Sequence, residues 1–279
     1  MDYDLRAVSD DPSPPAPPPS TSPVGLWVAA AVVAVLGAVY AAIVWWPRPA
    51  PPQAASSPPK AAFVEVPQSL GGQAEAVVLP PLDASDSVVR TLVRALSASP
   101  AVTAWVNTNG LIRNFTVSVA NIADGVTPAK HLSVLRPASG FRVLGHDGQL
   151  YVDPRGYDRF TPIADAIASV DPARAAALYA TVKPRIEEAY RDLGPSAPSF
   201  DRSLERAIVE LLKTPTVDGG IQLRPKGIGY AYADERLEGL SGAQKQLLRM
   251  GPRNVRAIKA SLRNIALALG VPASNLPTD

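Results

Sequence analysis

The chain has 279 residues, of which 47% are hydrophobic and 19% charged, and its formal net charge is +2. This composition supports a buried core and excludes a chain that is polybasic or disordered throughout. The absence of cysteine excludes disulfide bonds, thiolate metal sites and a cysteine nucleophile.

Residues 1–23 contain the tract Pro-Ser-Pro-Pro-Ala-Pro-Pro-Pro and few apolar side chains. A segment of this composition cannot bury a core, so we expect a disordered or polyproline-like tail. Two interpretations stay open for it. The tail is either a spacer or a docking peptide for a partner that binds proline-rich segments.

Val24 to Trp46 is an uninterrupted run of 23 apolar residues without charge. A bilayer core of about 30 Å needs ~20 helical residues, and Trp27 near one end with Trp45 and Trp46 at the other suits the headgroup layers. The acidic start and the length of the run argue against a cleaved signal peptide. The sequence therefore predicts a single uncleaved transmembrane helix over residues 24–46.

The orientation of this helix is left open by charge, because Arg6 precedes it and only Arg48 and Lys60 follow it nearby. Small side chains recur every fourth residue along one face, at Ala30, Ala34, Ala38 and Ala42. Such a face lets two helices approach closely and predicts a homodimer contact, although an alanine-rich helix also produces such a stripe by chance.

Residues 47–79 are again rich in Pro, Ala and Ser and are predicted to be a semi-stiff tether. From residue 80 to residue 279 the pattern is amphipathic, and about 200 residues suit one domain with a sizeable core. We expect helices over 83–99, 105–125, 157–170, 172–193, 200–213 and 241–269, the last broken at Gly251-Pro252.

Two short segments read as β-hairpins. Residues 141–152 flank Gly145-His-Asp-Gly, and residues 221–232 flank Pro225-Lys-Gly-Ile-Gly. The β-branched stretch Phe115–Val119 also allows a strand in place of the second helix. The predicted fold class is mainly α: a compact multi-helix domain with two small β-hairpins, plus one N-terminal transmembrane helix.

No pattern of catalytic, metal-binding or cofactor-binding residues is recognisable. His131 and His146 are 15 residues apart and lack a metal-ligand spacing, and Glu187 and Glu188 point about 100° apart on a helix. Nucleophile and phosphate-loop motifs are missing. We therefore predict no catalytic residue, metal or cofactor, and lean against an enzyme.

The most informative polar feature is a basic face on the last helical segment, formed by Lys245, Arg249, Arg253, Arg256, Lys259 and Arg263. It predicts a contact with an acidic protein, anionic lipid or nucleic acid, unless it is simply the solvated side of an amphipathic helix. Residues 247–258 also loosely resemble the second half of a helix-hairpin-helix DNA-binding motif, in which a glycine turn presents backbone N–H groups to a phosphate.

Five blocks together resemble an uncharacterised proteobacterial family of membrane-anchored proteins, domain-of-unknown-function family 3014. They are Leu79-Pro-Pro-Leu-Asp-Ala-Ser-Asp-Ser-Val-Val-Arg90, Gly110-Leu-Ile-Arg-Asn-Phe115, Glu187-Glu-Ala-Tyr-Arg-Asp-Leu-Gly194, Phe200-Asp-Arg-Ser-Leu204 and Gln244-Lys-Gln-Leu-Leu-Arg-Met-Gly-Pro-Arg-Asn254. The resemblance implies one N-terminal anchor, a tether and a periplasmic domain, and no activity.

The function expected from sequence is a non-enzymatic binding or scaffolding protein of the cell envelope. It is anchored once in the bacterial inner membrane, with its C-terminal domain in the periplasm. Expected partners are the bilayer, another envelope protein or an anionic envelope component, and a second copy through the transmembrane helix. The alternative is a cytoplasm-facing, membrane-tethered nucleic-acid binder that uses the basic C-terminal helix, and nucleic acid is an expected partner only in that case.

Overall fold

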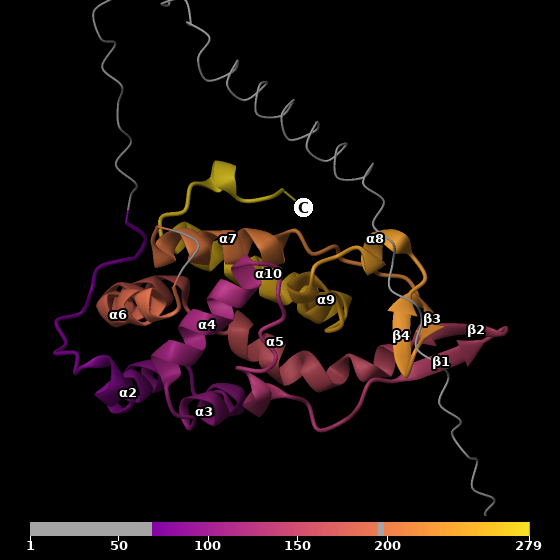
Figure 1. The fold of residues 1–279 in the computed structure, drawn as a ribbon, viewed down its shortest axis with the longest axis horizontal. Coiled ribbons are helices and arrows are strands. Elements are labelled where there is room, and N and C mark those ends of the chain that lie inside the picture. The colour runs from indigo at the N-terminus through magenta and orange to yellow at the C-terminus, as the bar shows by residue number, and fades with distance from the viewer. Residues whose placement is uncertain (1–68, 195–197, 279) are drawn as a thin grey trace, which may run out of the picture. The chain divides into compact units, whose positions relative to one another are not determined.

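The computed structural model describes residues 69–194 and 198–278 (Figure 1). The predicted transmembrane run 24–46, its alanine face and most of the predicted tether lie outside these residues. Among the helices that are described, none combines the length and the hydropathy that a membrane span requires.

The described chain is mainly helical. Its α-helices are α2 (Asp86–Leu96), α3 (Pro100–Val106), α4 (Leu111–Ala123), α5 (Thr161–Ala168), α6 (Pro172–Asp192), α7 (Phe200–Leu212), α8 (Glu235–Glu238), α9 (Gly242–Leu248) and α10 (Pro252–Ala268). Its strands are β1 (Val143–His146), β2 (Gln149–Val152), β3 (Gln222–Lys226) and β4 (Gly229–Tyr232). Short 3-10 helices include η1 (Leu82–Ala84) and η4 (Asp158–Phe160).

The main core lies where α4, α6, α7 and α10 pack together, and Phe200 at the start of α7 is at its centre. The Phe200 side chain is fully buried, and its ring lies 5.8 Å from Phe115, 6.3 Å from Tyr179 and 5.5 Å from Tyr190, measured between centroids. Aromatic rings bury large apolar areas and favour tilted or edge contacts at such distances. Phe200 of α7 therefore packs against aromatic rings of both α4 and α6, so three helices meet at this residue.

The expected mainly helical fold is confirmed, and α4 decides the open choice at residues 115–119 in favour of helix. One side of α4 buries Leu111, Ile112 and Val119, while the hydroxyls of Thr116 and Ser118 donate to carbonyls one turn earlier. Tertiary burial on a helical period thus overrides the strand propensity of the β-branched residues. The expected helix 172–193 forms as α6, which continues through Pro184 as one helix.

Both predicted hairpins form, and the structure joins them into one antiparallel sheet in the order β1-β2-β3-β4. The pairs Leu150↔Leu223 and Tyr151↔Gln222 connect the two hairpins. In the first turn Asp147 and Gly148 both have positive φ, the geometry of the tight hairpin turns that match strand twist. The sheet lies at one end of the described domain, away from α2 and α6 (Figure 1).

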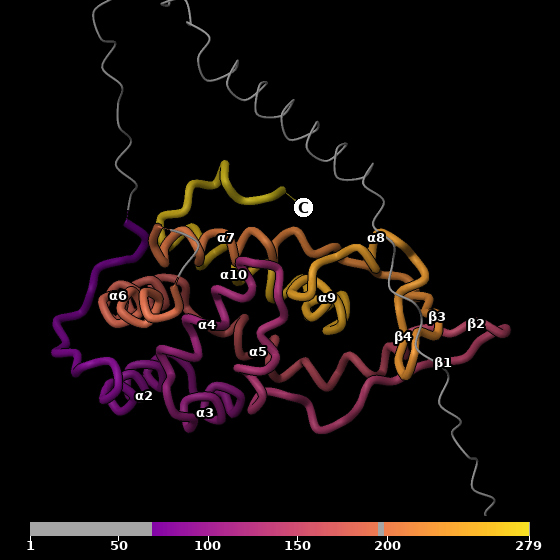
Figure 2. Tube along the Cα trace, in the orientation of Figure 1, coloured from indigo at the N-terminus to yellow at the C-terminus, as the bar shows by residue number. Residues whose placement is uncertain are grey.

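Residues Ser69–Pro81, which we call the strap, pack on the helices before the predicted domain boundary at residue 80. The strap runs past α6 on its way to α2 (Figure 2). The Gly71 N–H donates to the Leu269 carbonyl at 3.0 Å and the Gly72 N–H to the Ala176 carbonyl at 3.1 Å, and Leu70 is buried in the main core. The end of the predicted tether is therefore part of the folded domain.

Candidate functional site

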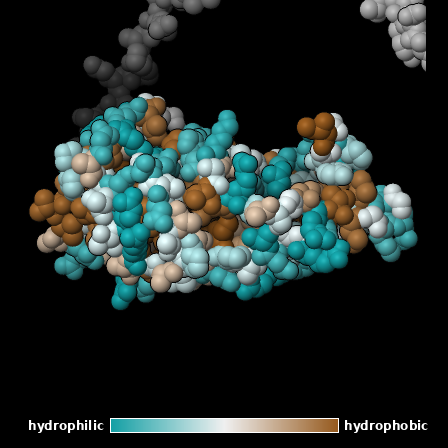
Figure 3. All heavy atoms as spheres, turned by 90° about the horizontal axis from the view of Figure 1, so that it is seen from below, coloured by the Kyte–Doolittle hydropathy of each residue, from teal (hydrophilic) through white to brown (hydrophobic). Residues whose placement is uncertain are grey.

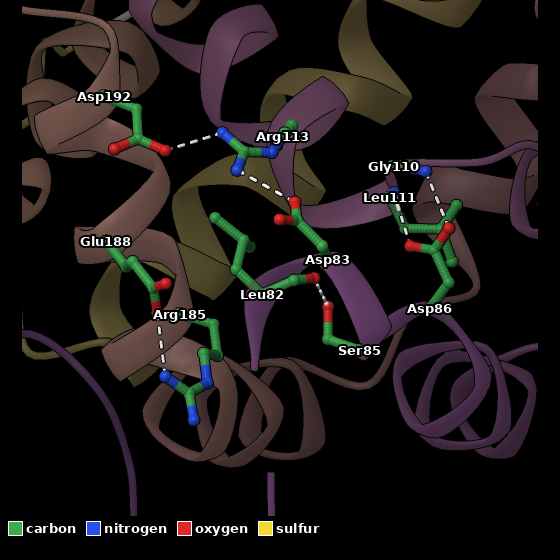
Figure 4. A network of polar contacts seen from close by, with 10 residues as sticks. All are labelled: Leu82, Asp83, Ser85, Asp86, Gly110, Leu111, Arg113, Arg185, Glu188 and Asp192. Carbon is green, nitrogen blue, oxygen red and sulfur yellow. Dashed lines mark hydrogen bonds and ion pairs between the residues drawn. The ribbon is translucent and has the colours of Figure 1, made fainter. Parts of the chain in front are cut away.

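Polar side chains concentrate at two junctions where the strap and the first helices meet α4, α6 and α7. At the first, the Asp86 carboxylate accepts from the N–H of Gly110 at 2.7 Å and of Leu111 at 2.9 Å (Figure 4). These N–H groups are among the unpaired donors at the start of α4, and a carboxylate is the preferred acceptor there. Asp86 thus ties the start of α2 to the start of α4.

Arg113 links two other elements at the same junction (Figure 4). Its guanidinium lies 2.7 Å from the Asp192 carboxylate at the end of α6 and 3.0 Å from the Asp83 carboxylate in η1. The hydrogen bonds that Arg113 donates, to Asp192 first and Asp83 second, raise its pKa. Because all three side chains are substantially exposed, solvent screens both pairs and they add little to stability, so their main effect is to orient η1.

The second junction, the Asp201 clasp, consists of Tyr179 and Lys183 on α6 and Asp201 on α7. Asp201 accepts from the Tyr179 hydroxyl at 2.5 Å and from Lys183 Nζ at 2.5 Å. It also accepts from the N–H of Leu70 in the strap at 3.0 Å. Burial, and then the hydrogen bond to Asp201, raise the pKa of Tyr179. One carboxylate therefore joins two helices and the strap.

Lys183 completes the clasp from the other side. Its ammonium donates to Ser69 Oγ at 2.5 Å and to the Leu70 carbonyl at 3.1 Å, in addition to Asp201. The side chains of Lys183 and Asp201 are only 18% and 17% exposed. All three ammonium donors are matched by acceptors, so the geometry supports a fastening point for the strap rather than a group poised for proton transfer.

The six residues of the predicted basic face are divided between two helices. Lys245 belongs to α9, Arg249 caps it, and Arg253, Arg256, Lys259 and Arg263 belong to α10. Arg253 pairs with Asp165 at 3.2 Å, Lys245 with Glu238 at 3.4 Å, and Arg256 with Asp218.

The remaining cations of the face also have acceptors within the chain. Lys259 Nζ donates to the Thr214 carbonyl at 3.2 Å, and Arg263 donates to the Pro277 carbonyl. Arg249 lies beside the Tyr232 hydroxyl. Burial raises the pKa of this hydroxyl, and the charge and hydrogen bond of Arg249 lower it by a smaller amount. The structure therefore places these cations beside internal partners. Among the three that form ion pairs, the side chains of Arg253 (68% exposed) and Arg256 (54% exposed) are more exposed than that of Lys245.

The turn between α9 and α10 has a structural explanation. Gly251 has φ +86°, and a Cβ at this position would lie 2.6 Å from Cδ2 and 2.8 Å from Cβ of Tyr157. Asn254 is 2% exposed and its amide donates to the carbonyls of Met250 at 2.9 Å and Tyr157 at 3.3 Å. The Tyr157 ring thus covers the glycine that the helix-hairpin-helix interpretation would present to a phosphate.

Comparison with known proteins identifies a family for the chain. The family model described as "Protein of unknown function (DUF3014)" matches residues 111–266, which is more than half of the chain. The chain belongs to the DUF3014 family. This confirms the family predicted from the five blocks, and the matched region runs from the start of α4 almost to the end of α10. No curated protein and no solved structure matched the chain.

Within the DUF3014 chain, four of the five blocks that carried the resemblance supply residues to the two junctions. Asp86, Arg113 and Asp192 come from three different blocks and Asp201 from a fourth, while the Gly251 turn forms the fifth. Sequence reasoning missed the Asp201 clasp. The signal available for it was the spacing of Tyr179, Lys183 and Glu187, four residues apart on one helical face.

Two carboxylates near the sheet make stability dependent on pH. A hydrogen bond from Arg155 lowers the pKa of Asp153 from 3.8 to about 2, and hydrogen bonds from Lys226 and the Tyr232 N–H lower that of Glu238 from 4.5 to about 2. A carboxylate whose pKa is lower in the folded state stabilises the fold above its unfolded pKa. This contribution is lost as the pH falls from about 4.5 towards 2.

We expect the free energy of unfolding to decrease between pH 5 and pH 2.5 and the variants Asp153→Asn and Glu238→Gln to reduce that decrease, because they remove the titrating groups. Urea unfolding followed by circular dichroism at each pH measures the effect. The matched control is Asp147→Asn at an exposed hairpin turn. Equal pH dependence in all four proteins would contradict the assignment.

Proposed function

We propose that this DUF3014 protein is a non-enzymatic binding or scaffolding protein of the bacterial cell envelope. It is anchored in the inner membrane through residues 24–46 and carries its helical domain in the periplasm. The apolar run and the Pro-rich segment support the anchor and tether. The periplasmic side is the expectation that the sequence resemblance implied.

The observation that carries the proposal is the Asp201 clasp at the start of the described domain. Chain ends usually fray unless they are tied down. Here Ser69 and Leu70, in the last third of the predicted tether, are fastened by Lys183 and Asp201. The tether is therefore joined firmly to α6 and α7, so the domain is held in a defined way at its membrane-proximal end. A scaffold that presents a binding surface needs such an attachment.

The exposed cations of α9 and α10 are the proposed contacts with an acidic partner protein or anionic envelope component, with Arg253 and Arg256 foremost. Their pairing with Asp165 and Asp218 reduces the net charge of the face. This favours a partner that exchanges its own carboxylates for those of the chain over long-range attraction of a polyanion. The nucleic-acid alternative has less support, because Tyr157 covers the Gly251 turn.

Fractionation and reporter fusions test the anchor and its orientation. We expect the full chain to stay with membranes after alkaline carbonate extraction, and an alkaline phosphatase fused after Asp279 to be active. Release into the supernatant would overturn the anchor. An inactive phosphatase on a stable, membrane-bound fusion would overturn the periplasmic placement and favour the cytoplasmic alternative.

Charge variants combined with in-cell crosslinking and mass spectrometry test the contact surface. Asp165→Asn with Asp218→Asn should increase the yield of the crosslinked partner, because Arg253 and Arg256 then lack internal partners. Arg253→Ala with Arg256→Ala should reduce it severalfold. Arg236→Ala, an exposed arginine on α8, is the matched control. Equal yields from all variants with unchanged folding would contradict the assignment.

A further inference from the structure

The free end of the sheet carries exposed apolar side chains that no part of the described domain covers. Ile228, in the turn between β3 and β4, is 113% exposed relative to the reference state, Tyr230 is 48% exposed and Phe141 is 42% exposed. Pro225 is exposed beside them. We call these four residues the apolar tip. Hydrophobic side chains are visible at the surface over this end of the molecule in Figure 3.

The register of the sheet shows that the tip continues a core-facing surface. Pro225 pairs with Tyr230, and two residues along the same strands Leu223 pairs with Tyr232. Alternate residues of a strand share a face, so Pro225 and Tyr230 lie on the face whose inner part, Leu223 and Tyr232, is buried. The rings of Phe141 and Tyr230 lie 6.2 Å apart, which brings the segment before β1 against β4. The apolar face therefore extends beyond the helices that cover it.

Three cations lie next to the tip along the chain: Arg224 and Lys226 belong to the opposite face of β3 by the same alternation, and Arg142 directly precedes β1. Two carboxylates form ion pairs with these or neighbouring cations, and each of them pairs with two. Asp153 pairs with Arg142 and Arg155, and Glu238 pairs with Lys226 and Lys245. These two ionic groups each carry a net positive charge, which complements an anionic surface.

An exposed apolar tip with cations next to it along the same strands has the chemistry of an interfacial membrane contact, in which apolar side chains enter the headgroup boundary and cations meet phosphates. The predicted anchor also keeps the domain close to a bilayer. Residues 47–68 span up to about 70 Å if extended at 3.1 Å per residue, whereas the radius of gyration expected for a domain of about 210 residues is ~17 Å. The tether is thus long enough for the sheet to reach the membrane.

We propose that the apolar tip docks on an anionic lipid bilayer, namely the membrane in which the chain itself is anchored. Ile228 enters the interfacial layer furthest, Phe141 and Tyr230 lie beside it, and Arg142, Arg224 and Lys226 contact lipid phosphates. The inference rests on the proposed anchor, but it holds whichever side of the membrane the domain faces. Docking at the sheet and fastening at the strap would together fix the orientation of the domain.

The cysteine-free sequence gives a direct test, because one introduced cysteine is the only labelling site. Full chains with Ile228→Cys or, as the control, Val126→Cys are labelled with a nitroxide and reconstituted into phosphatidylethanolamine–phosphatidylglycerol vesicles. Val126 is an exposed β-branched residue after α4. Collision rates with oxygen, which concentrates in lipid, and with a water-soluble nickel chelate are measured by electron paramagnetic resonance.

We expect the label at position 228 to collide several times less with the nickel chelate than the label at position 126, and more with oxygen. Equal nickel accessibility at both positions in vesicles would overturn the docking proposal, as would protection in native membranes alone, which would indicate a protein partner. Carbonate extraction of the same vesicles separates the two proposals. A chain that is released has lost its anchor, whereas a retained chain with a water-exposed label contradicts only the lipid docking.

Discussion

Gly251→Ala is expected to destabilise the domain by about 3 kcal/mol. The positive φ costs a residue with a Cβ about 1–2 kcal/mol, and overpacking of a filled site costs about 1–3 kcal/mol. Both apply here, because φ is +86° and the new Cβ would lie 2.6 Å from Cδ2 and 2.8 Å from Cβ of Tyr157. Urea unfolding of the purified full chain in detergent measures the loss.

The chain supplies a matched control for this substitution. Gly270 also has positive φ, at +91°, but no heavy atom lies within 4 Å of the position that a Cβ would take there. Gly270→Ala should therefore show only the backbone cost of about 1–2 kcal/mol. If both alanine variants lose the same stability, the close packing of Tyr157 on the turn is not what requires glycine at position 251.

Asp201→Asn is expected to cost about 2–3 kcal/mol and to release the strap. Removing one partner of a buried ion pair costs about 3–5 kcal/mol, and the residual exposure of Lys183 and Asp201 reduces this figure. Asparagine offers one acceptor oxygen where Leu70, Tyr179 and Lys183 all donate. We expect faster hydrogen exchange at the amides of Leu70 and Gly71, measured by mass spectrometry, together with the lower stability.

Asp192→Asn provides the comparison for an exposed ion pair. It removes one of the two surface partners of Arg113 and should cost much less stability than Asp201→Asn, without changing exchange in the strap. Lys183→Met in the Asp201→Asn background should recover part of the stability, because it removes the unpaired charge. Unchanged strap exchange in Asp201→Asn would show that the strap is held by its packing and not by the clasp.

These two sites suggest why the recognisable sequence blocks of the chain carry polar and glycine residues without a catalytic pattern. Asp86, Arg113 and Asp201 connect elements that are far apart in sequence, and Gly251 allows α10 to begin against Tyr157. Their roles in the structure are positional. For the binding function that we propose, the informative surfaces are instead the exposed cations of α10 and the apolar tip of the sheet.

The sequence by itself determined the elements whose signals are local. The helical period placed α7 and α10, glycine-containing turns placed the two hairpins, and Gly251-Pro252 separated α9 from α10. The expected helix 105–125 contains α4 but wrongly joined it to the end of α3, which is a separate helix over Pro100–Val106. Backbone preferences and capping act within a few residues, so they can be read without the fold. The family was also recognisable from its blocks, and residues 111–266 match it.

Only the tertiary structure decided which of these elements meet. The pairing of β2 with β3, the packing of the strap on α6, and the meeting of Lys183 with Asp201 all join residues distant in sequence. It also brought Asp165 and Asp218 to Arg253 and Arg256, so the basic stripe is partly neutralised within the chain. Periodicity specifies which face of a helix is polar, whereas the charges that face it depend on packing.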